Sequence, residues 1–134
     1  MPLHVELVSP EALVWSGDVD SVLLRTVGGG DIQFLTGHTP VLAALDICSV
    51  EMKRTDGLLE KVAVRGGFVE VSNDRVKILS DQGVLAEEVD PNVVRGQRTE
   101  AEAALARVQD ELERKKAEDD LKWHAAQLRA AGAE

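Results

Sequence analysis

Aromatic side chains and cysteine are scarce in this sequence. Phe, Trp and Tyr together make up 3% of the 134 residues, and Tyr is absent, whereas hydrophobic residues of all kinds reach 44%. The core is therefore expected to be built from Val, Leu, Ile and Ala. Cys48 is the only cysteine, which excludes an internal disulfide and favours a reducing compartment.

Long hydrophobic runs and an excess of positive charge are also missing. No apolar stretch approaches the roughly 20 residues that a membrane-spanning helix needs, and the opening MPLHVELVSPE lacks the pattern of a signal peptide. The net charge of −9 disfavours nucleic acids, whose phosphates require clustered Lys and Arg, and anionic membrane surfaces. The sequence predicts no nucleic-acid partner and no direct membrane insertion.

Residues 1–89 show the pattern of a β-domain. Leu3, Val5 and Leu7 alternate with polar residues, as in a half-buried strand, and turn signals recur about every eight to twelve residues. This density of short strands predicts an all-β sandwich. The expected strands cover 3–8, 12–15, 19–27, 32–35, 47–53, 59–65, 68–71, 76–79 and 84–86, and 41–45 is a further apolar run.

Residues 90–134 form the second expected domain, and they are helical in character. They hold 18 charged residues against 21 in the preceding 89, and they are rich in good helix formers. Asp90 followed by Pro91 is a helix start signal. An apolar stripe at helical spacing then follows at Ala101, Leu105, Val108 and Leu112.

The charged run 113–120 interrupts this stripe, which resumes at Leu121, Ala125 and Leu128. The run is either the turn of a hairpin or a solvated part of one long helix, because it contains neither Gly nor Pro. We favour the hairpin, with its turn between 109 and 118, because two short stripes bury more by facing each other. The predicted fold class is thus α+β, a sandwich followed by an antiparallel helical hairpin.

The stretch 28–45, GGGDIQFLTGHTPVLAAL, organises the β-domain. Its glycines favour sharp turns, and Pro40 pushes Thr39 toward an extended conformation. Asp31 and His38 are expected on two polar loop tips that flank a short buried strand. Polar loops on a rigid apolar scaffold are a common way to present a contact surface.

Residues 30–42 resemble the GxIGxLPGHxPLLxxL signature of the epsilon subunit of F-type ATP synthases. Gln33 stands in place of the usual Gly and Thr36 in place of the usual Pro. Shorter matches occur in the family's order at residues 15–17, 66–71, 76–81 and 87–90. The resemblance therefore extends over nearly the whole chain.

The resemblance implies a non-catalytic rotor subunit of the proton-translocating ATP synthase. In that family the β-domain binds the gamma subunit and rests on the ring of membrane c subunits. The helical tail extends along gamma into the alpha/beta catalytic head and inhibits ATP hydrolysis. It implies a peripheral location on the cytoplasmic face of the bacterial plasma membrane, with c-ring contacts at Gly30, Asp31, Gly37 and His38. The gamma contact is expected on an apolar sheet face that the sequence does not identify.

Some bacterial members of this family bind ATP through an Ile/Leu-Asp-x-x-Arg-Ala motif. Here Val89 and Asp90 begin the motif, but Val93 and Val94 occupy the Arg-Ala places and Arg95 comes two positions late. Asp90 and Arg95 are therefore the candidate nucleotide-binding residues, in a motif that is incomplete. No other cofactor is expected.

Two other functions remain as alternatives. In the first, the chain would be an adaptor or chaperone that reaches into another assembly with its hairpin. In the second, it would be a hydrolase that uses His38 with Asp31. The second lacks an activated nucleophile. The three histidines are far apart in sequence, which predicts no metal site, and the triple glycine lacks the ending of a P-loop.

Overall fold

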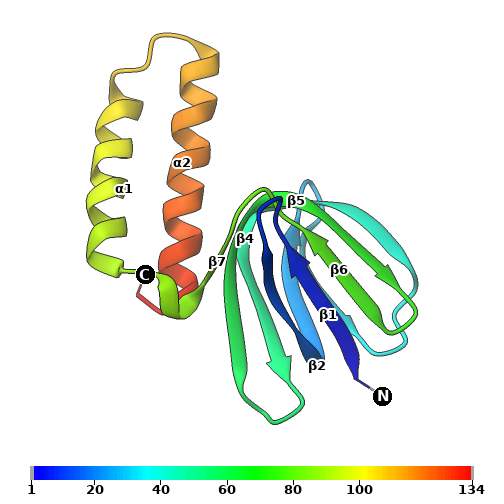
Figure 1. Cartoon of the computed structure of the whole chain (residues 1–134). Helices are drawn as coiled ribbons and strands as arrows, with labels where there is room; N and C mark the ends of the chain where they lie inside the picture. Colours follow the sequence, from blue (N-terminus) through cyan, green and yellow to red (C-terminus); the bar gives the residue numbers. More distant parts are fainter. Residues whose placement is uncertain (1, 134) are drawn as a thin grey trace.

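The computed structural model describes residues 2–133 and shows a seven-stranded β-sandwich followed by two packed helices (Figure 1). The predicted fold class is confirmed. Met1 and Glu134, the outer ends of the two expected domains, lie outside the described residues. The strands are β1 (Leu3–Val8), β2 (Leu13–Thr26), β3 (Gly30–Leu35), β4 (Val41–Arg54), β5 (Leu59–Ser72), β6 (Arg75–Leu79) and β7 (Gly83–Leu85).

The strands form one continuous hydrogen-bonded path that closes on itself. Its order is β1-β6-β5-β4-β2-β3, with β7 paired to β5 and β1 also paired to β2. Among the strands of residues 2–133, the β1–β6 pair is parallel and the other pairs are antiparallel. The long strands β4 and β5 pair with each other along their length, 41–45 with 67–71 and 47–53 with 59–65. On its other side β5 pairs with β7 through 62–64 and with β6 through 68–72.

The division into strands differs from the expectation of many short ones. Strands β2, β4 and β5 each run for 14 residues. Residues 16–18 read as a turn in the sequence, yet they stay in β2 because their backbone pairs with 4–6 of β1. At Gly66 and Gly67, which both have positive φ, β5 bends without ending, as the paired glycines suggest.

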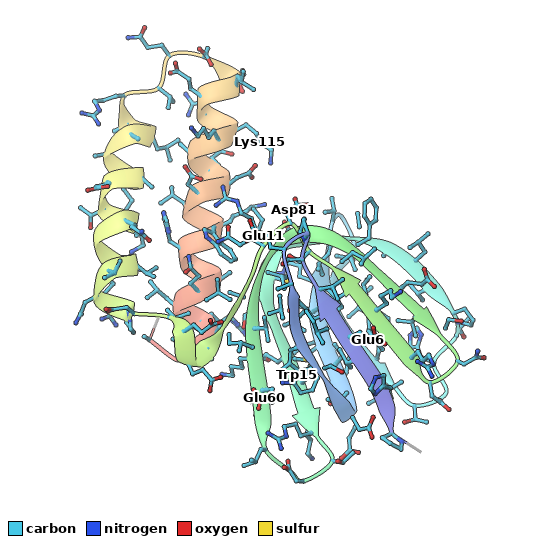
Figure 2. The ribbon with its side chains drawn as sticks, viewed as in Figure 1. Glu6, Glu11, Trp15, Glu60, Asp81 and Lys115 are labelled. Carbon is cyan, nitrogen blue, oxygen red and sulfur yellow. The ribbon has the colours of Figure 1, made fainter. Side chains whose placement is uncertain are left out.

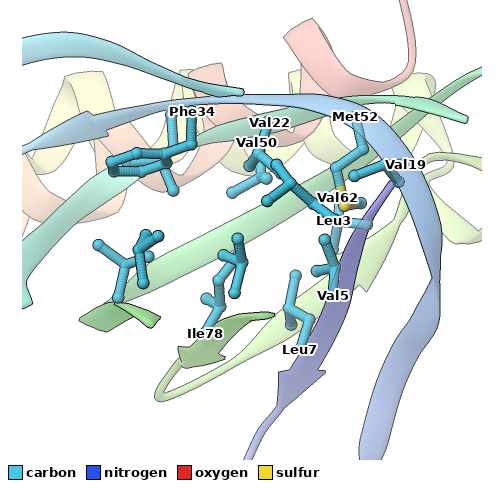
Figure 3. Close-up of a cluster of buried hydrophobic side chains, with 14 of the residues drawn as sticks. Leu3, Val5, Leu7, Val19, Val22, Phe34, Val50, Met52, Val62 and Ile78 are labelled. Atoms are coloured by element: carbon cyan, nitrogen blue, oxygen red, sulfur yellow. The ribbon is translucent and has the colours of Figure 1, made fainter. Parts of the chain in front are cut away.

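The core lies between the two layers and is mostly aliphatic, as predicted (Figure 3). Strand alternation sends Leu3, Val5 and Leu7 inward, all fully buried. Phe34 and Met52 are the exceptions to the aliphatic composition. Every residue of this cluster comes from a strand, so the sandwich has a hydrophobic core of its own.

The tail is an antiparallel hairpin of α1 (Pro91–Ala106) and α2 (Glu111–Ala130), preceded by a short 3₁₀ turn at Ala86–Glu88. The turn comprises residues 107–110, which is earlier than most of the expected window. The charged run 113–120 belongs to α2, where Asp110 caps the helix by accepting from the Glu113 N–H at 2.8 Å. Leu112 is 83% exposed and is not part of the apolar stripe.

Candidate functional site

The signature residues Gly30 and Asp31 begin β3, which pairs only with β2. Asp31 lies opposite Arg25 in the ladder, and its Oδ1 accepts from Nε of Arg25 at 2.9 Å. The expectation that Asp31 lies on a loop tip is therefore wrong. Asp31 lies in strand β3 and has a cationic partner. The hydrogen bond and charge of Asp31 raise the pKa of Arg25. Both side chains are more than half exposed, so the pair is accessible to a partner.

The turn after β3 holds the other two signature residues. Gly37 has φ +83, which only glycine adopts readily. The His38 N–H donates to the Leu35 carbonyl at 3.1 Å, its Nδ1 lies 2.6 Å from the Thr39 carbonyl, and its ring meets the buried Phe34 edge-on at 4.8 Å. His38 is therefore held in place from three sides, at the opposite end of β3 from Asp31.

The two candidate nucleotide-binding residues have partners within the chain. Asp90 is the N-cap of α1, and its Oδ1 accepts from the N–H groups of Asn92 and Val93. Arg95 donates to the Ala133 carbonyl at 2.9 Å and to Asn92. Asp90 thus caps the first helix of the hairpin, and Arg95 connects the beginning of α1 to the residues that follow α2.

The helical arm, residues 90–133, rests on the sandwich through α2. Trp123, Ala126 and Ala130 are buried against Ala63 of β5, with Ile47, Val84 and Ala86 at the margin. Among the buried residues of this described cluster Trp123 is the one large side chain, and it packs on the sandwich. Two ion pairs flank the contact, Arg65 with Asp120 at 2.7 Å and Lys122 with Asp46 at 3.6 Å. Helix α1 packs on α2, away from the sheets (Figure 1).

The buried side chains of the two helices are mostly small and apolar, but they include the polar Gln127. Val94 and Ala101 of α1, and Ala117 and Leu128 of α2, are buried. The Nδ1 of His124 is also buried and has no hydrogen-bond partner among the described residues. Burial lowers the pKa of His124, against the opposing effect of Asp120.

A cavity of about 220 Å³ separates α2 from the outer face of β2 and β4. Cys48 lines it, together with Ala125 and Ala126 of α2. Burial raises the pKa of this thiol to about 11. Cys48 as a whole is half-buried.

The outer face of the opposite layer carries a row of apolar side chains, named here the apolar row: Val8, Leu79, Phe68 and Ala44. Register places these residues side by side across β1, β6, β5 and β4. Phe68 is 56% exposed and Leu79 49%, and a groove lies beside them, lined in part by Pro10 and Asp81. Glu6, labelled in Figure 2, lies on the same layer in β1. In the sequence the row is indicated by Phe68. Val69 and Val71 point into the core, so Phe68 is an apolar residue at a position of β5 where the alternation places the side chain outside.

Two absences complete the description of residues 2–133. Among them, no group of three or more His, Cys, Asp or Glu side chains is arranged to hold a metal ion. None of the described helices combines the length and apolar character needed to cross a membrane.

The β-sandwich, the turn held by the contacts of His38 and the docked helical arm define a two-part chain in which a helical arm rests on a β-domain. Residues 2–86 match the family described as ATP synthase, Delta/Epsilon chain, beta-sandwich domain. The ATP synthase epsilon chain of Halalkalibacterium halodurans is 37% identical over 131 residues, 97% of both chains. The epsilon chain of Bacillus subtilis is 38% identical over 120 residues, 90% of this chain and 84% of its own.

The fold of this chain is also similar to that of a chain in a solved structure. A chain in the cryo-EM structure of the Euglena gracilis mitochondrial ATP synthase, OSCP/F1/c-ring, superposes with a TM-score of 0.82 at 26% identity, over 97% of this chain and 81% of that chain. The protein belongs to the ATP synthase epsilon chain family. An epsilon chain is a non-catalytic subunit of the F-type ATP synthase.

Proposed function

We infer that this chain connects the c-ring to gamma in the central stalk, and that its helical arm inhibits ATP hydrolysis. Family membership over almost the full chain supports the first part. The second part is supported by the docking contact of the arm, in which Trp123 is the one large side chain among the buried residues of the described cluster. A contact this small allows the arm to leave the sandwich while the separate core keeps the sheets folded.

The c-ring contact is proposed at Gly30, Asp31, Gly37 and His38. The Arg25–Asp31 pair is exposed, so both charges are available to polar loops of the ring. His38 is fixed by its backbone and ring contacts, which makes it a rigid contact point. The strand β3 connects the two and sets their spacing.

The gamma contact is proposed on the apolar row. Helix α2 covers the outer face near Ala63, whereas the apolar row leaves Phe68 and Leu79 about half exposed. Contiguous exposed apolar surface is characteristic of interaction sites. This assignment leaves the arm free on the other side of the sandwich, where it can move toward the alpha/beta head.

This assembly would hold the chain peripherally at the cytoplasmic face of a bacterial plasma membrane, without insertion of its own. Asp90 and Arg95 are proposed to serve the structure of the hairpin, because both already have partners within the chain. The arm is therefore proposed to work without a bound nucleotide.

Removal of residues 90–134 tests the inhibitory role. Because the core cluster contains no helical residue, the truncated chain is expected to keep its fold and to assemble. ATP hydrolysis by the assembled enzyme should rise several-fold relative to the enzyme with the full chain. An assembled, truncated enzyme with unchanged hydrolysis would contradict the inhibitory role, while the structural role in the stalk would stand.

A further inference from the structure

Arg65 of the sandwich lies at the contact with the helical arm. Arg65 of β5 lies beside Ile47 of β4 in the sheet, and its own N–H donates to the Gln82 carbonyl at 2.9 Å. Its backbone is therefore fixed in the ladder, directly before the bend at Gly66. The side chain extends from this fixed point toward α2.

Arg65 makes two different contacts with α2. Its guanidinium donates to Oδ1 of Asp120 at 2.7 Å, and its central carbon lies 5.8 Å from the centre of the Trp123 ring. Asp120 and Trp123 are three residues apart, so they lie on the same face of the helix. A planar guanidinium is suited to bond a carboxylate at its edge while its face meets an aromatic ring.

Both contacts are shielded more than ordinary surface interactions. Arg65 and Asp120 are each only about one third exposed, and Trp123 is 6% exposed. The second ion pair, between Lys122 and Asp46, is longer at 3.6 Å, and Lys122 is 52% exposed. Screening by water and salt weakens exposed pairs, so the Arg65 contact contributes more to docking.

We propose that Arg65, Asp120 and Trp123 form a clamp that sets the fraction of the chain in which the arm is docked. The inference rests on the proposed role of the arm, but docking itself is a property of the isolated chain. The clamp requires no bound ligand, because all three members belong to the chain. Loss of Arg65 weakens the ion pair and the ring contact together.

Cys48 provides a native probe of docking. It is the only thiol of the chain, and it lines the cavity beneath Ala125 and Ala126 of α2. Departure of α2 uncovers it. The rate at which a bulky aromatic disulfide reagent modifies Cys48 in the isolated full-length protein therefore reports the undocked fraction.

We expect Arg65→Ala to raise the modification rate about five- to tenfold, the size expected when a partly exposed ion pair and a cation–π contact are lost together. Asp120→Asn should give a smaller rise, because the contact with the ring remains. Lys115→Ala is the matched control. Lys115 pairs with Asp119 within α2 and lies on the part of the helix that projects past the sheets (Figure 2), so its rate should equal the wild-type rate.

Equal rates for Arg65→Ala and wild type would overturn the clamp. So would a rise accompanied by faster amide exchange at Val62 and Val64, which are fully buried in β5, because the sheet itself would then be opening. ATP hydrolysis by enzyme assembled with Arg65→Ala separates the two proposals. A faster thiol reaction with unchanged hydrolysis supports the clamp and contradicts inhibition by the arm.

Discussion

At the scale of single residues, Gly67 lies against the backbone of the end of β6. A Cβ added there would stand 1.8 Å from the Leu79 carbonyl oxygen, and φ is +118. Both the space and the backbone conformation therefore require glycine. The approach lets β5 bend over β6 and continue as one strand through both layers.

Gly67→Ala should lower the free energy of unfolding by about 3 kcal/mol or more, because the backbone of β6 would have to move and the new side chain would be strained. Urea denaturation monitored by circular dichroism measures this change. Gly96→Ala is the control. Gly96 lies in α1 with open space around its Cβ position, so alanine should stabilise the protein by up to about 1 kcal/mol. Equal stability of Gly67→Ala and wild type would contradict the close approach.

The residue scale also shows how far sequence can locate a contact. The glycines at 66 and 67 predict a bend or a close neighbour, and the structure has both. The pairing of Asp31 with Arg25 was not predicted, because it depends on the register of β2 with β3. A shift of one residue in that register would place Asp31 on the other face of the sheet.

At the scale of elements, the sequence predicts the hairpin, but the turn at 107–110 overlaps only the beginning of the expected window 109–118. The charged run 113–120 interrupts an apolar stripe, yet a charged face is compatible with a helix, and the run lies within α2. The informative signal was Asp110 with Glu113 three residues later, the spacing of an N-cap and its acidic partner. Caps mark a helix boundary more directly than a change in hydrophobic pattern does.

The hairpin should lose stability as the pH falls, through His124. Burial lowers the pKa of His124 in the folded chain, and the charged groups that act on it are Asp120 of its own helix, Arg65 of β5 and Arg98 of α1. The folded state therefore binds the proton less tightly than the unfolded state does. Stability is unaffected well above the ordinary histidine pKa of about 6.5, and it falls as the pH drops below that value.

His124→Gln should remove this part of the pH dependence. The measurement is the melting temperature between about pH 7.5 and 5.5, where carboxylates remain largely ionised. We expect the wild-type melting temperature to drop more than that of the variant over this interval. Parallel curves for the two proteins would contradict the assignment of the buried Nδ1 as the responsible group.

At the scale of the whole molecule, the two outer faces of the sandwich differ in whether the helical arm covers them. One receives α2 over Ala63, and the other carries the apolar row. Composition and alternation predicted a sandwich and an arm, but they did not show which face the arm covers. That choice depends on the long-range packing of Trp123 against Ala63, which leaves no local pattern in the sequence.

Phe68→Glu tests the assignment of the uncovered face to gamma. Phe68 is 56% exposed, so the substitution should change the stability of the isolated chain by only about 0.5 kcal/mol. A carboxylate at the centre of an apolar contact should weaken binding to purified gamma at least about tenfold, measured by titration calorimetry. Leu112→Glu, at an 83% exposed position on the arm, is the control and should bind gamma as wild type does. Wild-type affinity in Phe68→Glu would move the gamma contact to another face.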